Sequence, residues 1–462
     1  MKAALAQPTT AAPALHRHLS PVSGNIARAH IAPILGPRVW WVGPLDVEGL
    51  LLGALQAALT AANNLLGHDQ FAVDAHQLGT WTASQEHLRV DGRSLRSTAH
   101  ATKFFPCHDG WLRAHDSRPG HICPLAKCLH TDSPESLART MTAQQAEHLI
   151  REYGGTAAAV RTPQEWLASE PGRVVSARPW IDFTVPSPSP THTPEPPRPP
   201  GLPGIRIIDL TDLTLGPAAA QLLALLGADV LRVVPPNQEA PTGRQLDTGF
   251  GKRTAEIDLN SDSGRSRLDE IFSEADAVIS SGYRRRDASS ALDSTAIARR
   301  HPHLAVVDIT AWGDSGPWQH EGGSDTIVQA ATGIAQLYSR PVHSTEEPSD
   351  VDGTGSTLVW RPAPREPGTL PVQALNQATG YGAAAATLAL IARRHTEGTA
   401  GTARLSLART AHELLTLPSL DGPAQDIPGV LDEVDSEYGV LTYARPAVLT
   451  GGMPMDYAAP PA

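Results

Sequence analysis

The sequence predicts an α/β protein with a doubly wound parallel sheet in its second half and a smaller α+β domain in its first half. After residue 204, short runs of β-branched residues alternate with helical patterns. Such alternation is typical of a parallel sheet with helices on both faces. Before residue 185 strand and helix patterns are mixed, and a proline-dense segment separates the two regions.

In the second half, the strands are expected at 205–210, 228–234, 254–259, 277–280, 304–310 and 402–407. The helices between and after them are expected at 216–226, 263–275, 294–300, 376–394 and 408–415. Pro217 supports the start of the first helix, because a proline in the first turn removes an N–H that has no partner there. We expect 205–418 to form one domain.

The first half is expected to contain helices at 49–66, 75–88 and 143–153, and a strand at 71–73. Strand-like residues at 104–114 surround a Cys-His-Asp-Gly turn. The apolar run at 49–62 is shorter than the roughly 20 residues that a membrane span needs, and Asp46, Glu48 and Asn63 bracket it. We therefore interpret it as a core helix.

Proline divides the chain. It accounts for 41 of the 462 residues, about twice its usual share, and the segment 185–204 is so rich in it that polyproline II is the expected conformation. The predicted organisation is a flexible arm at 1–36, a small-domain-like α+β portion at 37–184, a linker at 185–204, the doubly wound domain at 205–418 and a C-terminal tail at 419–462. An irregular stretch at 341–371 is expected as an excursion from the second domain.

Composition excludes several classes of function. A formal charge of −11 argues against a nucleic-acid partner, whose phosphates require clustered lysine and arginine. Three cysteines cannot form a disulfide framework, and with no signal-like start we expect a cytoplasmic protein without a membrane partner. One cluster has the residue types of a zinc site, but its spacing is not diagnostic, so no metal is expected. It comprises Cys107, His108, His115, His121, Cys123, Cys128 and His130.

The segment 45–64 aligns with the segment 375–394 without gaps, each as an apolar helix that begins at a polar residue. Each is followed by a short strand pattern and a helix rich in small residues. We interpret this as a partial duplication, although two helices rich in alanine and leucine can resemble each other through composition alone.

Several motifs of the second half resemble CoA-transferase family III, the CaiB/BaiF family, which also contains the 2-methylacyl-CoA racemases. They are GIRIIDLTDLTLGPAAAQLLALLGADVLRVVPP (204–236), GKRTAEIDLNSDSG (251–264), HPHLAVVDITAWGDSGPW (301–318), GGSDTIVQAATGIAQL (322–337) and LPVQALNQATGYGAAAATLALIARR (370–394). DGWLRAHDSRPGH (109–121) and RTPQEWLASEPGR (161–173) resemble the family's later portion. The resemblance implies a Rossmann-like domain, with the usual order of the portions altered.

The family's nucleophile is an aspartate at the start of a crossover helix. It attacks the acyl thioester and then carries CoA as an aspartyl thioester. Asn376 occupies that position here, and Asp46 occupies the aligned position of the first repeat. Asp325 matches an acidic position of the family, and Ser324 stands where the racemases have a histidine. Both aspartates also suit a helix N-cap, Asp325 for the helix that carries Gln329.

Coenzyme A or acyl-CoA is expected as a substrate rather than as a permanently bound cofactor. The resemblance places its binding at Gly216, Pro217, Lys252 and Arg253. The leading hypothesis is exchange of CoA between an acyl-CoA and a carboxylic acid. The first alternative is a family member that binds acyl-CoA without turnover. The second, less favoured alternative is a racemase-like enzyme. We expect either a monomer with an internal pseudo-dimer or an interlocked homodimer.

Overall fold

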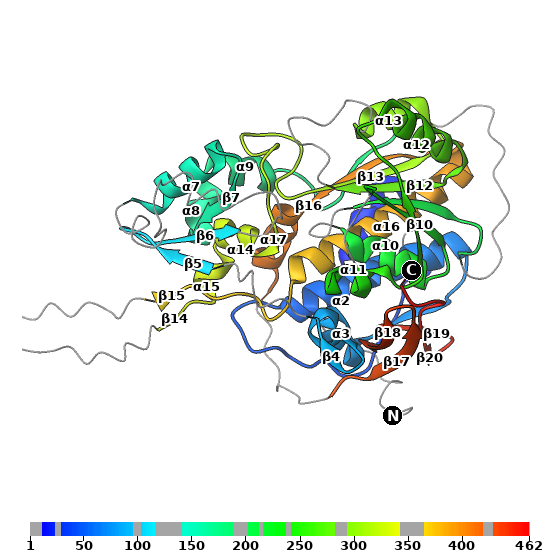
Figure 1. Cartoon of the computed structure of the whole chain (residues 1–462), viewed down its shortest axis with the longest axis horizontal. Coiled ribbons are helices and arrows are strands. Elements are labelled where there is room, and N and C mark those ends of the chain that lie inside the picture. Colours follow the sequence, from blue (N-terminus) through cyan, green and yellow to red (C-terminus); the bar gives the residue numbers. More distant parts are fainter. Residues whose placement is uncertain are drawn as a thin grey trace, which may run out of the picture.

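The computed structural model describes residues 12–23, 29–95, 103–115, 141–187, 202–211, 216–236, 242–281, 293–341, 365–418 and 428–461. Within these ranges, seven strands form one sheet in the order β11-β10-β9-β12-β13-β16-β8 (Figure 1). Their bounds are β8 (Asp182–Thr184), β9 (Arg206–Leu210), β10 (Asp229–Val234), β11 (Lys252–Glu256), β12 (Ala277–Ser281), β13 (Ala305–Thr310) and β16 (Gly401–Ser406).

The six strands from β9 onward are mutually parallel, and β8 pairs antiparallel with β16. Counted from β9, the parallel strands follow the order 3-2-1-4-5-6, in which doubly wound nucleotide-binding sheets are arranged. The predicted doubly wound parallel sheet is therefore confirmed.

Helices cover both faces of this sheet. Strand residues Ile207, Ile279 and Val307 belong to the core that contains α10 (Pro217–Leu225) and α16 (Ala374–Glu397). Their sequence neighbours Ile208, Val278 and Val306 belong to a second core. That core contains residues of α12 (Asp262–Glu274) and α13 (Ser294–Arg300). The alternation follows from the strand period of two, which sends successive side chains to opposite faces.

Two predicted elements differ from the structure. The strand expected at 254–259 is β11 at Lys252–Glu256, because Lys252 is the first residue in register with β10. The helix expected at 75–88 is divided into α3 (Ala75–Thr82) and α4 (Ser84–His87). Its break follows Thr82, whose hydroxyl donates to the carbonyls of Leu78 and Gly79 and so competes with the helical hydrogen bonds.

The two aligned segments of the sequence form equivalent units. In the first half, β1 (Ile34–Leu35) and β2 (Phe71–Asp74) pair in parallel around α2 (Val47–Leu66), and α3 follows β2 directly. In the second half, β13 and β16 pair in parallel around α16, and α17 (Leu407–Thr416) follows β16 directly. Helix α2 packs along α16, which itself rests on the large sheet. This common arrangement supports the interpretation of a duplication.

A three-stranded antiparallel sheet lies at one end of the molecule (Figure 1). It consists of β5 (Lys103–Pro106), β6 (Trp111–His115) and β7 (Thr156–Ala159), with α7 (Ala143–Glu152), α8 (Pro163–Ala168) and α9 (Glu170–Ser176) around it. Its contacts to the sheet domain run through α14 (Asp325–Thr332), which α15 (Ile334–Leu337) follows. The strands β14 (Arg340–Pro341) and β15 (Arg365–Glu366) form a short hairpin pair at the ends of 342–364, the part of the predicted excursion outside the described residues.

The last part of the chain, which we expected as a tail, contributes strands where the structure describes it. They are β17 (Leu431–Ser436), β18 (Gly439–Ala444), β19 (Val448–Thr450) and β20 (Met453–Pro454). Strand β19 pairs with β2, and β18 pairs with β3 (Arg89–Val90), which also pairs with β4 (Arg93–Ser94). The C-terminal residues therefore complete two sheets of the first half. The remaining domain boundaries stay predictions.

Helix α2 is, by length and composition, the one candidate membrane span found among the described residues. In the fold, 89% of the 18-residue apolar stretch of this helix is buried inside the protein, as in a core helix.

Candidate active site at the start of helix α16

The start of α16 is capped by a carboxylate from another helix. Gln373, the residue at the N-cap position, makes no side-chain capping bond. Asp325 of α14 does so instead, because its Oδ2 accepts the backbone N–H of Asn376 at 2.8 Å. Its Oδ1 accepts the side-chain amide of Gln329 at 2.5 Å. The alternative function that we considered for Asp325, capping of its own helix, is therefore wrong: the residue caps α16.

Asp325 is a buried acid, with only 2% of the residue exposed. Burial raises the pKa of Asp325 to about 6, although hydrogen bonds from Asn376, Gln329 and the backbone of Leu375 and the charge of Arg244 act in the opposite direction. A carboxyl group with such a pKa exchanges a proton near neutral pH, which suits an acid or base in catalysis.

Asn376 lies beside this carboxylate. Its side-chain nitrogen donates to Gln373 Oε1 at 3.0 Å, and the guanidinium of Arg244 lies 3.4 Å from the same oxygen. Its Oδ1 is buried and has no hydrogen-bond partner, and the buried Oγ of Ser324 also has none. The helix start thus combines one carboxylate with two polar atoms whose hydrogen-bonding capacity is unused. An amide at residue 376 supplies no nucleophilic oxygen comparable to a carboxylate.

Asp46, the residue aligned with Asn376 in the sequence, is the N-cap of α2, whereas Asn376 is the third residue of α16. The Oδ1 of Asp46 accepts the backbone N–H of Gly49 at 2.9 Å, which makes this residue an N-cap. The carboxylate also forms a buried ion pair with Arg38, whose Nε binds Glu48 at 3.2 Å. The Arg38 guanidinium stacks over the ring of Trp40 at 4.0 Å, so that Asp46 belongs to a closed ionic cluster.

Lys252 and Arg253, the predicted basic ligands of CoA, lie in different surroundings, the first buried and the second exposed. The Lys252 side chain is 1% exposed, and its ammonium donates to Asp209 Oδ2 at 2.9 Å and to the carbonyl of Pro217 at 3.3 Å. Burial alone would raise the pKa of Asp209, but the ammonium and Thr211 hold it below its usual value. Arg253 is exposed and pairs with Asp229 through two hydrogen bonds of 2.9 and 2.8 Å. Lys252 would therefore meet a phosphate only after its ion pair had opened.

Gly216 and Pro217 begin α10 as predicted. Gly216 has a φ of +90°, and a Cβ there would lie 2.6 Å from the side chain of Ile309. Glycine is therefore required by both backbone conformation and space. The loop 212–215 before it lies outside the described residues.

Of the predicted catalytic residues, the structure brings Asp325 and Asn376 into contact, while Asp46 belongs to its own ionic cluster. Sequence reasoning missed Arg244 of α11 (Gly243–Gly249), whose guanidinium donates a hydrogen bond to the side chain of Gln373. It also missed Asp247, which accepts the Ser84 hydroxyl at 2.8 Å and whose pKa burial raises to about 6. No local motif marks either residue, and only the capping box of Thr242 and Gln245 indicates that α11 exists.

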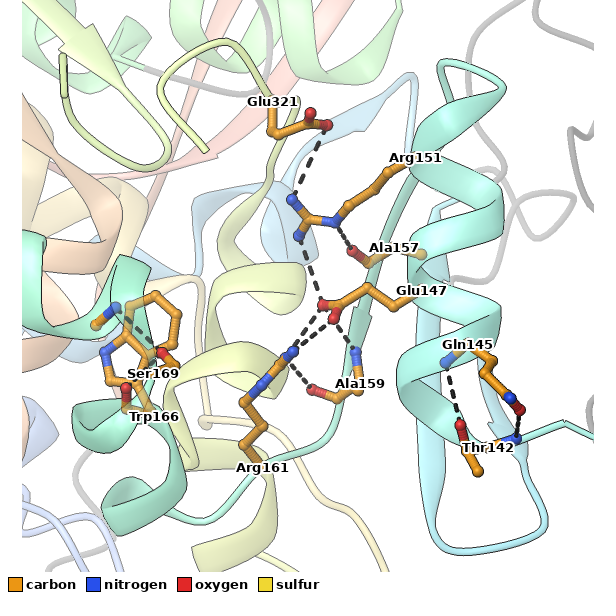
Figure 2. A network of polar contacts seen from close by, with 11 residues as sticks. Thr142, Gln145, Glu147, Arg151, Ala157, Ala159, Arg161, Trp166, Ser169 and Glu321 are labelled. Atoms are coloured by element: carbon orange, nitrogen blue, oxygen red, sulfur yellow. Dashed lines mark hydrogen bonds and ion pairs between the residues drawn. The ribbon is translucent and has the colours of Figure 1, made fainter. Parts of the chain in front are cut away.

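A second buried network joins the three-stranded sheet to the loop before Asp325 (Figure 2). Glu147 lies between Arg151 and Arg161, binding Arg161 at 2.5 Å and lying 3.7 Å from Arg151. Arg151 also stacks over Trp318 at 3.9 Å and lies 3.9 Å from Glu321. The loop that leads to Asp325 is thus fixed from outside the sheet domain.

Among the described residues, no group of three or more His, Cys, Asp and Glu side chains could hold a metal. Four residues of the cluster with zinc-site residue types, His121, Cys123, Cys128 and His130, lie outside the described residues. That cluster is therefore not tested.

The doubly wound parallel sheet, with helices on both faces, defines an α/β protein. Residues 202–428 match the model of CoA-transferase family III, and through this half the chain belongs to that family.

Two similar proteins are also named as CoA-transferases. An acyl-CoA transferase from Gibberella moniliformis is 31% identical over 44% of this chain and 37% of its own length. A succinate–glutarate CoA-transferase from Agrobacterium fabrum is 32% identical over 27% of this chain and 36% of its own length. The chain thus spans little more than a third of the length of these relatives.

Among solved structures, Rv3272 from Mycobacterium tuberculosis is 26% identical. The alignment covers 48% of this chain and 57% of that chain, with a TM-score of 0.38.

Proposed function

We propose that this chain is an acyl-CoA-binding member of CoA-transferase family III that does not form the aspartyl thioester at the start of α16. The observation that carries the proposal is Asn376. The residue at the position of the family's nucleophile is an amide, and the carboxylate beside it, Asp325, is occupied by the N–H of Asn376 and by Gln329.

The geometry of Asp46 supports the same conclusion. A carboxylate nucleophile must present a lone pair to the thioester carbon. Both oxygens of Asp46 face Arg38, and one of them also accepts the N–H of Gly49. Attack from this position would require opening a buried ion pair, whose loss typically costs about 3–5 kcal/mol.

Exchange of CoA through Asp46 is the second candidate. One observation favours it: Asp46 lies at the start of the repeated helix, where the helix dipole stabilises a carboxylate or a developing oxyanion. A racemase-like reaction has less support, because Ser324 replaces the histidine that the resemblance would require for proton transfer.

The two repeated helices bear on the oligomeric state. Both α2 and α16 are buried along nearly their whole length, and each covers the other. The surface through which an unduplicated crossover helix would meet a second chain is therefore occupied within this chain. We propose a monomer with an internal pseudo-dimer, and a clearly dimeric mass in light scattering would contradict it.

The deciding experiment uses the full chain with succinyl-CoA. Binding is measured by calorimetry, and covalent intermediates are trapped with hydroxylamine and located by peptide mass spectrometry. We expect binding without an adduct in the wild type and in the control Asp46→Asn. In Asn376→Asp we expect an adduct at position 376. An adduct at Asp46 in the wild type would establish the second candidate instead, and failure to bind any CoA ester would contradict both.

A further inference from the structure

A buried arginine lies in the middle of the three-stranded sheet, and no acidic residue of the described part of the chain neutralises it. This residue, Arg113, is on the central strand β6, where it pairs with Phe104 of β5 and Ala158 of β7. Only 7% of the residue is exposed. Its Nε is buried and has no hydrogen-bond partner. Arginine is almost never buried to this extent unless its charge is paired.

The charge of Arg113 is retained in these surroundings. Burial lowers the pKa of Arg113 to about 10, and no charged group in the described part of the chain is close enough to affect it. The guanidinium is therefore still protonated at neutral pH. Two other arginines of this region, Arg151 and Arg161, are also largely buried, but Glu147 lies between them. Burying a cation without such a partner is costly, so a role in the fold alone does not explain Arg113.

The arginine faces the side of the small sheet that is covered by helix α14. Successive residues of a strand face opposite sides, and the neighbours Leu112 and Ala114 belong to a separate core with α7. The cross-strand partner Ala158 belongs to the main core together with residues of α14, and Phe104 packs against that core. Helix α14 contacts both β6 and β7 (Figure 1). The guanidinium of Arg113 therefore lies on the inner face of the small sheet.

The orientation of the guanidinium leaves its hydrogen-bond donors available. Its central carbon lies 4.3 Å from the centre of the Phe104 ring, over the face of the ring. Such stacking uses the flat face of the guanidinium and leaves the N–H groups at its edges. These are the donors with which arginine binds both oxygens of a carboxylate. The cross-strand neighbours, Phe104 and Ala158, have side chains of carbon only.

We propose that Arg113 binds a small monocarboxylate whose hydrocarbon part packs against Phe104. One guanidinium balances one negative charge. A phosphate or a dicarboxylate would bring further charge into a buried place where the described part of the chain has no second cation to meet it. The carbon side chains beside the guanidinium favour an acid with a short hydrocarbon chain, such as butyrate. The inference goes beyond the proposed function and does not depend on the binding of CoA.

Calorimetric titration of the full chain with sodium butyrate tests the inference, with sodium chloride and sodium phosphate at equal ionic strength as reference salts. Arg113→Met removes the charge and keeps a long side chain. Arg113→Lys keeps the charge and loses the bidentate donor geometry. Arg267→Gln changes an exposed arginine on α12 and is the control. Butyrate should bind the wild type and the control equally, Arg113→Lys about tenfold more weakly, and Arg113→Met without measurable affinity.

Thermal unfolding gives a second readout that a purely structural role would not reproduce. In chloride, replacing an unpaired buried cation by an apolar side chain should leave the midpoint of Arg113→Met unchanged or raise it. Butyrate should raise the midpoint of the wild type in a saturable way, because it binds the folded chain, and should leave that of Arg113→Met unchanged.

Equal affinity for butyrate in the wild type and Arg113→Met would overturn the inference, as would a wild type that shows no saturable binding. Phosphate that binds more tightly than butyrate and is lost in Arg113→Met would identify an inorganic-anion site and refute the monocarboxylate. A clear fall of the midpoint of Arg113→Met in chloride would show that the fold itself needs the guanidinium. Undiminished butyrate affinity in folded Arg113→Lys would contradict bidentate binding.

Discussion

The buried acid Asp325 predicts a specific dependence of stability on pH. Its pKa in the fold is about 6, against an ordinary value of 3.8. A difference of about two pH units corresponds to about 3 kcal/mol in the free energy of unfolding. Because the pKa is raised in the folded state, this stabilisation is present below about pH 4 and is lost as the pH rises through about 6.

The perturbation that isolates this contribution is Asp325→Asn, which keeps the shape of the side chain and removes its titration. Its amide oxygen can still accept the N–H of Asn376, while its nitrogen faces the amide of Gln329, a conflict that costs the same at every pH. We therefore expect the variant to gain about 2 kcal/mol of stability relative to the wild type as the pH rises from 4 to 7, somewhat less than the full difference of about 3 kcal/mol because the unfolded carboxyl is already partly ionised at pH 4.

Urea unfolding of both proteins at pH 4, 5, 6 and 7 gives the required free energies. Other groups titrate in both proteins and cancel in the difference. A difference that stays constant across this range would refute the reasoning, since Asp325 would then titrate alike in the folded and unfolded chain.

Three further predictions concern stability and are checked by urea unfolding. Asp46→Asn keeps the N-cap but weakens the ionic cluster of Arg38, so we expect a loss of about 3 kcal/mol, and an unchanged midpoint would contradict the cluster. Lys252→Met leaves the Asp209 carboxylate buried without a counter-charge and should lower the free energy of unfolding by about 3–5 kcal/mol. Arg253→Gln breaks an exposed ion pair and should lower it by at most about 1 kcal/mol. Equal losses of stability in the two variants would refute this contrast between a buried and an exposed pair. Thr410→Val removes the acceptor of the buried Trp180 indole N–H and should cost about 1–3 kcal/mol, and a stability within error of the wild type would show that the bond is not needed.

The parallel sheet could be predicted because its signal is local. Runs such as Ala305–Thr310 consist of residues that favour strands, and their alternation with helices limits the topology. Helix α16 was equally clear, since its apolar residues continue around the whole helix and indicate complete burial.

The contacts of the site could not be predicted, because they join residues far apart in the sequence. The bond between Asp325 and Asn376 spans 51 residues, and the ion pair of Lys252 with Asp209 spans 43. A pattern places these residues at the ends of elements, but only the packing decides that Asp325 turns to α16 and that Lys252 turns inward.

The strands near the C-terminus were missed for a different reason. Strand β17 has the sequence LDEVDS, and its side chains alternate only between exposed and half-buried. An edge strand of this kind carries charged residues that protect it from pairing with other chains. In the sequence, such a segment is hard to distinguish from a solvated tail.

The pairing of β19 with β2 has a consequence for the order in which the protein folds. Gln77, just after β2, donates to the carbonyl of Arg445, which lies 368 residues later. At a synthesis rate of about 5–20 residues per second, the first half waits about 20–75 s for these partners. During that time β2 lacks its partner β19 and β3 lacks its partner β18, and the unpaired edges of a nascent chain invite aggregation. The sheets of the first half are therefore complete only after β18 and β19 have been synthesised. Such pairing between distant parts of the chain favours slow folding and a need for chaperones during synthesis.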